Sequence, residues 1–206
     1  KGWVRCAEAS VAASPQTGTS RPAPALDLSD AQQQAVKTVS EGFGSFQAFL
    51  LEGVTGSGKT EVYLRLIDPL LTRQRQVLVL VPEIGLTPQL VSRFRERFAT
   101  EIAVLHSGLN DSQRLQAWDA AARGRAQLIL GTRSAVFTPL PDPGLIIVDE
   151  AHHASLKQQE GFRYSARDLA VWRAQRLGIP VLLGSATPSL ESLYNVRQGR
   201  YRHLQL

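Results

Sequence analysis

The feature that most constrains the fold of this chain is the segment GVTGSGKT at residues 53–60. It fits the P-loop pattern, in which a glycine and four residues precede Gly-Lys-Thr and backbone N–H groups curl around a phosphate chain. An apolar run at 46–51 leads in and a helix-compatible stretch at 61–71 leads out. The alternative is an ordinary glycine-rich turn, but every fixed position is filled and both flanks agree. We therefore expect a nucleoside triphosphate site between a strand and a helix.

Each fixed residue of this segment suits a triphosphate. Glycines allow the backbone to approach the anion closely, and the helix that opens near Gly58 directs its positive dipole end at the same group. Lys59 supplies a point charge to the β- and γ-phosphates, and the Thr60 hydroxyl is placed to ligate Mg²⁺. The predicted nucleotide-binding residues here are Gly53, Gly56, Ser57, Gly58, Lys59 and Thr60.

The rest of the sequence predicts alternating strands and helices. Expected strands lie at 46–51, 77–81, 102–105, 127–130, 145–148 and 181–183. Helices are expected at 30–40, 61–71, 88–98, 165–177 and 190–197, with another that ends at residue 122 and is capped by Asp111 or Ser112. This alternation predicts an α/β domain, a parallel sheet with helices on both faces. We place that domain at residues 26–206, after a remnant of a preceding domain and a flexible linker at residues 1–25.

Composition narrows the class of protein. The apolar fraction of 43% suffices for a core, while no apolar run approaches the roughly 20 residues of a membrane span and no signal peptide is visible. Cys6 is the single cysteine, which excludes an internal disulfide and a cysteine zinc cluster within this chain. We expect a soluble, cytoplasmic protein without a membrane partner. The net charge of +5 suits a polyanion partner, but charge alone leaves nucleic acid undecided. Neither end looks like a natural boundary, so we expect an excised part of a longer protein.

A second motif, IIVDEAH at residues 146–152, completes the nucleotide site. Asp149 emerges from the carboxyl end of a buried strand, where ligands of open α/β sheets bind, and would hold Mg²⁺ opposite Thr60. Glu150 is placed to polarise the water that attacks the γ-phosphate. A kinase would not need this glutamate, because its nucleophile belongs to the substrate. The pattern therefore predicts hydrolysis. His152 either couples this site to another region or caps the next turn, and we interpret His153 as a solvated neighbour.

A third segment, GSATP at residues 184–188, also follows an apolar strand. The hydroxyls of Ser185 and Thr187 can hydrogen-bond to the strand end that carries Asp149, although a simple cap for the following helix is an alternative. Gln32 has the donor and acceptor pair that adenine needs, but from spacing alone a solvated helix residue is the better explanation. His106 and His203 lack metal-ligand spacing and are interpreted as structural.

The P-loop, DEAH and SAT motifs in this order are similar to the first motor lobe, a RecA-like domain, of superfamily-two helicases. Finer segments resemble the PriA family, the bacterial primosomal replication-restart DNA helicases. These segments are GVTGSGKTEVY at 53–63, VPEIGLTPQ at 81–89, LHSGLN at 105–110, GTRSAVFTP at 131–139 and KQQEGFRYSARDL at 157–169. The resemblance covers residues 26–206. One departure is DEAHH where some members carry DEEHD, and it leaves Asp149, Glu150 and His152 intact.

The resemblance implies roles for individual residues. Gln32 matches the glutamine that reads adenine, and Lys59, Asp149, Glu150 and His152 match catalytic positions. Residues that match DNA-contacting motifs are Thr87, Thr132, Arg133, Ser134, Phe162, Tyr164 and Arg167. The last three lie in an aromatic-rich loop that links DNA binding to ATP hydrolysis, for which a core-packed flap is the alternative. Hydroxyl groups and arginine suit phosphate contacts, and aromatic rings can stack on unpaired bases.

The resemblance also implies ATP and Mg²⁺ as cofactors, 3′→5′ helicase activity in replication restart, and a cytoplasmic, nucleoid-associated protein. The implied partners are single-stranded and forked DNA, with other primosome proteins and single-strand-binding proteins engaged by the full-length protein. A second lobe, which carries an arginine finger and a cysteine-rich zinc element, is missing from this chain, so we expect the fragment to be nearly inactive alone. Two alternatives are a P-loop ATP switch that binds a protein partner and a duplex DNA translocase.

Overall fold

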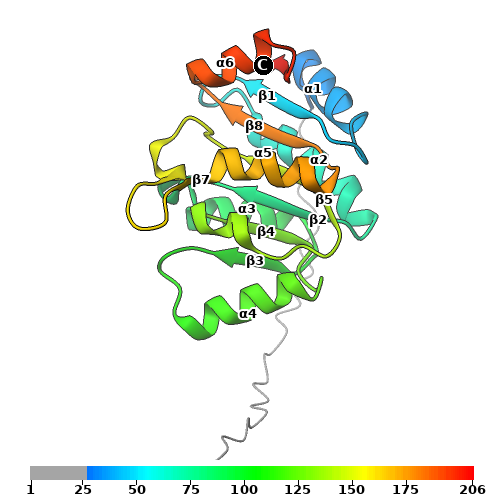
Figure 1. The fold of residues 1–206 in the computed structure, drawn as a ribbon. Helices are drawn as coiled ribbons and strands as arrows, with labels where there is room; N and C mark the ends of the chain where they lie inside the picture. Colours follow the sequence, from blue (N-terminus) through cyan, green and yellow to red (C-terminus); the bar gives the residue numbers. More distant parts are fainter. Residues whose placement is uncertain (1–26) are drawn as a thin grey trace, which may run out of the picture.

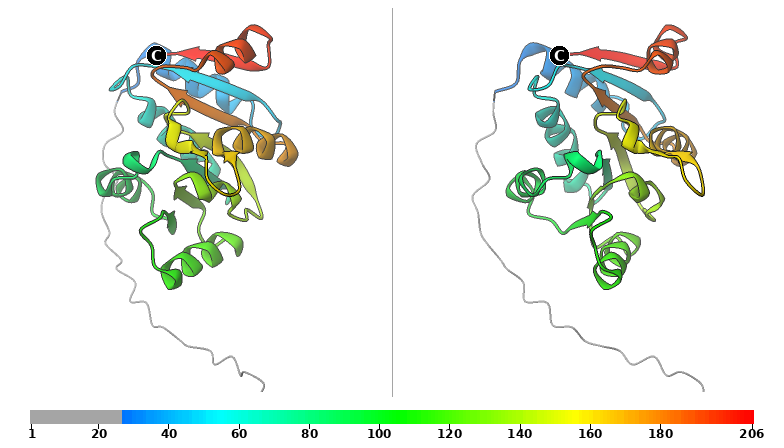
Figure 2. Two further views of the ribbon diagram at one scale, coloured as in Figure 1. Left: turned by 60° about the vertical axis from the view of Figure 1, so that its left-hand side comes forward. Right: turned by 90° about the vertical axis from the view of Figure 1, so that its left-hand side faces the viewer.

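The computed structural model describes residues 27–206, so the interpretations of residues 1–25 and of Cys6 lie outside the described part. The described residues form a seven-stranded sheet in the order β3-β4-β2-β5-β8-β1-β9, and every neighbouring pair is parallel. Helices lie on both faces of this sheet (Figures 1 and 2). The predicted α/β architecture is confirmed.

The elements follow the predicted alternation. The strands of the main sheet are β1 (Ala48–Glu52), β2 (Gln76–Leu80), β3 (Ile102–Leu105), β4 (Leu128–Gly131), β5 (Pro143–Val148), β8 (Val181–Ser185) and β9 (Tyr201–Gln205). The α-helices are α1 (Asp30–Ser40), α2 (Lys59–Thr72), α3 (Pro88–Arg97), α4 (Asp111–Ala122), α5 (Ala166–Leu177) and α6 (Leu190–Arg197). Short pieces are the 3₁₀ turns η1 (Glu83–Gly85), η2 (Arg133–Phe137) and η3 (Ala154–Leu156), and the hairpin of β6 (Lys157–Gln158) with β7 (Tyr164–Ser165).

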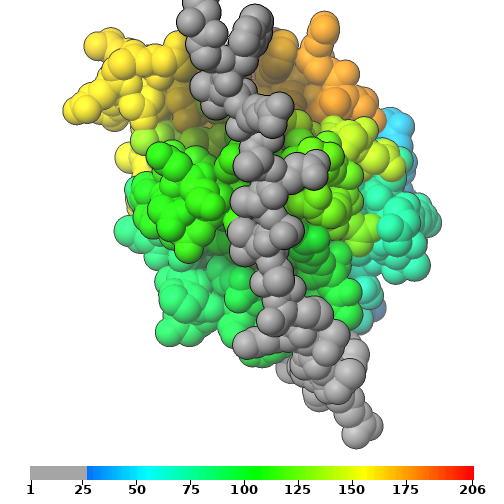
Figure 3. Space-filling model, turned by 90° about the horizontal axis from the view of Figure 1, so that it is seen from below, coloured from blue at the N-terminus to red at the C-terminus, as the bar shows by residue number. Residues whose placement is uncertain are grey.

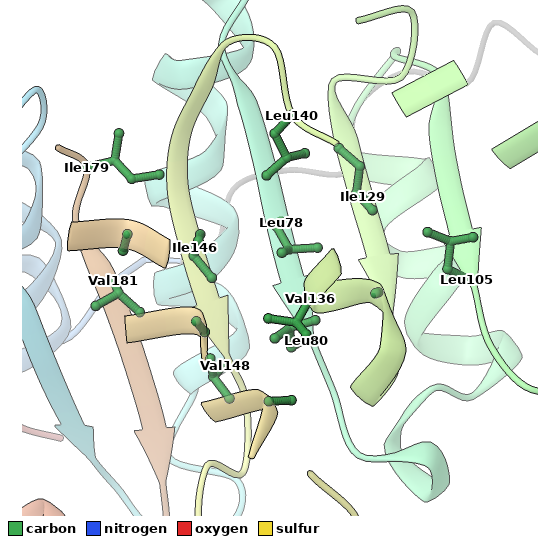
Figure 4. Close-up of a cluster of buried hydrophobic side chains, with 14 of the residues drawn as sticks. Leu78, Leu80, Leu105, Ile129, Val136, Leu140, Ile146, Val148, Ile179 and Val181 are labelled. Carbon is green, nitrogen blue, oxygen red and sulfur yellow. The ribbon is translucent and has the colours of Figure 1, made fainter. Parts of the chain in front are cut away.

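The core consists of one apolar layer on each face of the sheet. Along β2, Leu78 and Leu80 point to the layer under α4, α5 and η2, whereas Val77 and Val79 point to the layer under α1, α2 and α3. Figure 4 shows the first layer, with side chains from β2, β4, β5 and β8 projecting toward α5 and η2. Because both faces are covered, the central strands are apolar without alternation, which explains their continuous apolar runs in the sequence.

Helix starts follow capping rules. Ser29 and Gln32 form a reciprocal capping box at α1, and Thr87 caps α3 with Pro88 at its first position. The cap of α4 is Asn110, which forms a second capping box with Gln113, so the prediction of Asp111 or Ser112 is wrong. The physical reason is that the reciprocal bonds of Asn110 and Gln113 satisfy two N–H groups at once.

Two features were not predicted. Strand β9 runs parallel to β1 at the edge of the sheet, with Glu52 opposite Gln205. The hairpin of β6 and β7 projects from the region between β5 and α5 (Figure 1). No helix within residues 27–206 is long and apolar enough to cross a membrane.

Candidate functional site

Three neighbouring strands, β1, β8 and β5, bring the three motifs together at their carboxyl ends. The Gly53 N–H donates to the Ser185 carbonyl at 3.1 Å, which joins the P-loop to the SAT turn. The Ala151 N–H donates to the Gly184 carbonyl at 2.8 Å, which joins the DEAH segment to the same turn. The position of β8 between the other two strands therefore makes its turn a physical link between them.

The P-loop has a backbone conformation that favours glycine at two positions. Gly56 and Gly58 have φ values of 84° and 85°, in the left-handed region. A Cβ on Gly58 would also overlap the Gln32 amide nitrogen. Within this loop the Ser57 hydroxyl is buried and has no hydrogen-bond partner in the described residues. A buried hydroxyl without a partner is costly, and a hydroxyl donor of this kind in a glycine-rich loop before a helix fits a phosphate chain.

Lys59 and Glu150 face each other across this loop. Lys59 Nζ donates to the Gly53 carbonyl at 2.7 Å and the Val54 carbonyl at 3.4 Å, and it lies 3.5 Å from Glu150 Oε1. The lysine side chain is only 7% exposed, so its charge is held in place. Glu150 has a φ of 45°, a left-handed conformation that costs a non-glycine residue about 1–3 kcal/mol. Such strain is typical of functional positions, where surrounding contacts hold it.

Asp149 accepts a hydrogen bond from Tyr63, whose hydroxyl donates to Asp149 Oδ1 at 2.8 Å. Burial raises the pKa of Asp149, and the Tyr63 hydrogen bond opposes that rise without cancelling it. Burial and the adjacent Asp149 charge raise the pKa of Tyr63 well above 10, so the phenol stays a donor. Gly184 makes room for this ring, since a Cβ there would overlap the hydroxyl.

Sequence reasoning did not include Tyr63 among the site residues. The signal for it was its helical spacing: it lies four residues after Lys59 on α2 and so shares a face with the P-loop lysine. Its partner is 86 positions away in the sequence and could not be inferred from that spacing.

The histidines and Ser185 make definite contacts. His152 Nδ1 lies 2.8 Å from Ser185 Oγ and 3.5 Å from Glu150 Oε2, and Ser185 Oγ also accepts the Thr187 N–H at 3.1 Å. His153 is not a solvated neighbour as predicted, because its ring accepts the Ser155 N–H at 3.2 Å and caps η3.

The two histidines interpreted as structural also have partners. His203 Nε2 lies 2.7 Å from Glu52 Oε2 and joins β9 to β1. His106 Nδ1 accepts the Gly108 N–H at 3.1 Å, which holds the turn after β3.

A cavity of about 420 Å³ lies over these groups and is lined by Gln32, Gly56, Lys59, Thr60, Asp149 and Glu150. Gln32 donates from Nε2 to the Ser57 carbonyl at 2.9 Å and accepts the Ser29 N–H at 2.9 Å, so its amide fastens α1 to the P-loop. Arg93 of α3 also lines the cavity, 3.7 Å from Glu61 Oε2, and was not predicted. The volume lies within the range of small-molecule sites.

A second cavity, of about 410 Å³, lies at the ends of β2, β3 and β4 and includes Thr132, Arg133, Ser134 and Tyr164 among its lining residues. Four of the predicted DNA-contacting residues are therefore brought together. Thr87 is not among the lining residues, and its side chain accepts the Leu90 N–H at 3.2 Å as the cap of α3.

The aromatic-rich loop projects from this side of the molecule. Phe162 is 77% exposed, whereas Tyr164 packs edge-on against Phe137 with ring centroids 5.0 Å apart. In the space-filling view of Figure 3, the yellow segment that contains this loop stands out at one corner. The loop is thus anchored by Tyr164 and exposes Phe162.

Two predicted DNA-contacting arginines bind protein acceptors in this structure. Arg133 donates to the carbonyls of Ser155 at 3.3 Å and Lys157 at 3.0 Å. Arg167 donates to Asp168 Oδ1 at 2.8 Å and Ser189 Oγ at 3.1 Å, and its side chain is 12% exposed. Arg133 therefore holds the start of the aromatic-rich loop, and Arg167 ties α5 to the turn before α6.

A P-loop, an Asp-Glu strand end and a Ser-Ala-Thr turn on neighbouring parallel strands define the nucleotide-binding lobe of a RecA-like helicase motor. The family model for DEAD/DEAH box helicases matches residues 29–196, and the chain belongs to that family. The resemblance to PriA is confirmed at the level of sequence. The chain is 60% identical over 161 residues to "Replication restart protein PriA" of Haemophilus influenzae, covering 78% of this chain and 22% of that protein.

A second relative is "Replication restart protein PriA" of Bacillus subtilis, 46% identical over 183 residues, with 88% of this chain and 23% of that protein covered. The chain thus spans about a quarter of the length of the curated relatives it matches. Among solved structures, RecG bound to a three-way DNA junction matches 88% of this chain and 24% of its own, with a TM-score of 0.60 and 20% identity. A hypothetical ATP-dependent RNA helicase from Sulfolobus tokodaii matches 88% of this chain and 53% of its own, with a TM-score of 0.61 and 20% identity. These structures support the fold.

Proposed function

We propose that the chain is the first motor lobe of an ATP-dependent 3′→5′ DNA helicase that acts in replication restart. The observation that carries this proposal is the meeting of Lys59, Asp149 and Glu150 in one cavity of about 420 Å³. The names of the PriA relatives support the assignment to replication restart. The bound group would be ATP with Mg²⁺, and the metal ion would supply positive charge that offsets the charge developing on the phosphates.

The residues of this chain would act as follows. The P-loop N–H groups and the Ser57 hydroxyl would donate hydrogen bonds to the phosphate chain, while Thr60 and Asp149 would hold Mg²⁺. Lys59 exchanges the carbonyls of Gly53 and Val54 for phosphate oxygens, which loosens its 3.5 Å contact with Glu150. Glu150 is then available to orient and deprotonate the attacking water. Gln32 reads adenine once its amide leaves the Ser57 carbonyl.

His152 and Ser185 would couple hydrolysis to lobe movement. Their 2.8 Å contact joins the strand end that carries Glu150 to the turn that carries Thr187. A change in the position of Glu150 therefore reaches the SAT turn through two hydrogen-bonded side chains.

The proposed nucleic-acid partner is single-stranded or forked DNA. Thr87, Thr132, Arg133 and Ser134 would contact the DNA backbone, and the titles of solved neighbours such as RecG name a DNA junction. Phe162 and Tyr164 would meet unpaired bases, and Arg167 would support their loop. Other primosome proteins and single-strand-binding proteins would engage the longer protein, in the cytoplasm and at the nucleoid.

Hydrolysis by this chain alone should be slow. A helicase motor closes ATP between two lobes, and residues 27–206 form one lobe. Loss of an arginine finger from a second lobe costs about 10³–10⁵ in rate. Any zinc element would belong to that second lobe.

The proposed function is tested by two measurements on the chain. Fluorescence anisotropy with a labelled single-stranded oligonucleotide should show binding that weakens steeply with salt, because arginines displace counterions from phosphates. ATP turnover with and without that DNA should remain near the rate of Lys59→Ala. Absence of DNA binding at low salt, with ATP binding retained, would favour the protein-binding switch instead. Fast DNA-stimulated turnover would overturn the requirement for a second lobe.

A further inference from the structure

The second cavity, of about 410 Å³, has aromatic side chains among its lining residues as well as the residues proposed to contact the DNA backbone. It lies at the carboxyl ends of β2, β3 and β4. Its lining includes Trp118 from α4 and Tyr164 from β7, two aromatic residues that are both half-buried. Phe137 packs edge-on against Tyr164 at 5.0 Å and fixes that ring.

The polar groups of this cavity carry both signs of charge. The Glu83 carboxylate accepts a hydrogen bond from the Ser107 hydroxyl and contributes a negative charge to the lining. The nearby cations are held in place by neutral carbonyls, since Arg133 donates to two loop carbonyls and Arg114 donates to the Leu109 carbonyl at 3.3 Å. Both guanidinium groups keep their positive charge and suit the phosphates of a nucleotide, whereas the Glu83 carboxylate suits a donor on its base.

A planar, neutral group with N–H donors on its edge suits the same lining. Aromatic side chains stack on the faces of nucleobases, and a carboxylate accepts from an exocyclic amino group such as cytosine N4. Ligand cavities of this size combine apolar walls with a few convergent polar groups. Ser134 lies exposed among the lining residues, at a position suited to the phosphate of the same nucleotide.

We propose that this cavity receives one unstacked nucleobase of the bound single strand. Trp118 and Tyr164 stack on the base, and Glu83 accepts from its exocyclic amino group. The inference rests on the proposed DNA binding and adds to it a contact that depends on the base, with cytosine preferred over thymine. Enzymes that take a base out of the stack read it in this way, by stacking and by hydrogen bonds to its edge.

The test compares single-stranded oligonucleotides of equal length and charge by fluorescence anisotropy. One is oligo-deoxycytidine, and the other has the same backbone with abasic sites throughout. The unmodified chain should bind the first between about fivefold and a hundredfold more tightly, the range expected for stacking of one base. Trp118→Ala should reduce this ratio at least about fivefold. Trp172→Ala is the matched control, because Trp172 is 58% exposed on α5 and away from the cavity, and it should keep the ratio.

Glu83→Gln tests the edge contact without removing an aromatic ring. Glu83 is exposed, so the variant should fold, and its preference for oligo-deoxycytidine over oligo-deoxythymidine should fall at least about threefold. If Trp118→Ala does not fold, as judged by circular dichroism, Glu83→Gln decides. Equal binding of the base-containing and abasic oligonucleotides by the unmodified chain would overturn the inference and leave DNA binding intact. Binding of neither oligonucleotide would overturn the inference and the proposed DNA binding together.

Discussion

Tyr63→Phe isolates the hydrogen bond beneath the carboxylate that would hold the metal ion. The wild-type hydroxyl donates to Asp149 Oδ1 at 2.8 Å, and Tyr63 is only 2% exposed, so water does not replace the lost donor. A hydrogen bond to a charged group contributes about 1.5–3 kcal/mol. In a domain of this size, 1 kcal/mol corresponds to about 2–4 °C in Tm. We therefore expect the Tm of the variant to fall by about 3–12 °C at neutral pH.

The pH dependence of this loss has a defined sign. Burial raises the pKa of Asp149, and the Tyr63 hydrogen bond lowers it, so the variant has a still higher pKa at Asp149. A carboxyl group with a raised pKa stabilises the fold while protonated and loses that contribution as the pH rises through its folded-state pKa. The stability difference between wild type and variant should therefore be largest at neutral pH and shrink in acid.

Differential scanning calorimetry over a pH series from about 4 to 8 measures both effects. Tyr194→Phe is the matched control, because Tyr194 is 56% exposed and its free energy of unfolding should change by no more than about 0.5 kcal/mol. A Tyr63→Phe variant with a Tm within about 1 °C of wild type at neutral pH would refute the reasoning. So would a deficit that stays constant as the pH falls.

Three further variants test neighbouring contacts. Gly184→Ala should destabilise the chain by about 1–3 kcal/mol in thermal melts, because the new Cβ overlaps the Tyr63 hydroxyl. Its effect and that of Tyr63→Phe should add to less than their sum, since without the hydroxyl the nearest atom to the Cβ is Tyr63 Cζ at 3.0 Å. Asp149→Asn removes a charge whose burial is unfavourable, so calorimetry should show a higher Tm without nucleotide. The variant should also lose Mg²⁺-dependent nucleotide binding. A lower Tm would contradict the raised pKa of Asp149. Arg133→Lys replaces the rigid guanidinium, whose Nη1 donates to both loop carbonyls, by a flexible ammonium, so hydrogen exchange at residues 155–158 should accelerate while the core stays protected. Unchanged exchange would contradict this positioning role.

Much of the fold follows from the sequence because the physical constraints are local. Strands β2 and β5 are apolar without alternation because helices cover both faces of the sheet. The P-loop backbone is left-handed at two positions, and such a conformation favours the glycines found there. Strand β9 gives a weaker pattern. Its residues are half-buried or exposed and none is fully buried, and it pairs only with β1 at the edge of the sheet.

The candidate site could be located from motifs, but its side-chain partners could not. Tyr63 and Asp149 are 86 positions apart, and only the sheet order places α2 beside the end of β5. Arg133 was predicted to face DNA, yet in this structure its guanidinium meets carbonyls that the loop after β5 brings to it. Hydrogen-bond partners depend on tertiary contacts, which local patterns do not encode.

The central claim is that residues 53–60 and Asp149 together hold ATP with Mg²⁺. Isothermal titration calorimetry of ATP into the chain, with Mg²⁺ and with EDTA, tests this claim most directly, and Lys59→Ala provides the comparison. We predict saturable, Mg²⁺-dependent binding by the wild type and a loss of at least about tenfold in affinity, or 1.4 kcal/mol, in the variant. Equal affinity in the two proteins, or binding by the wild type that EDTA does not weaken, would contradict the account.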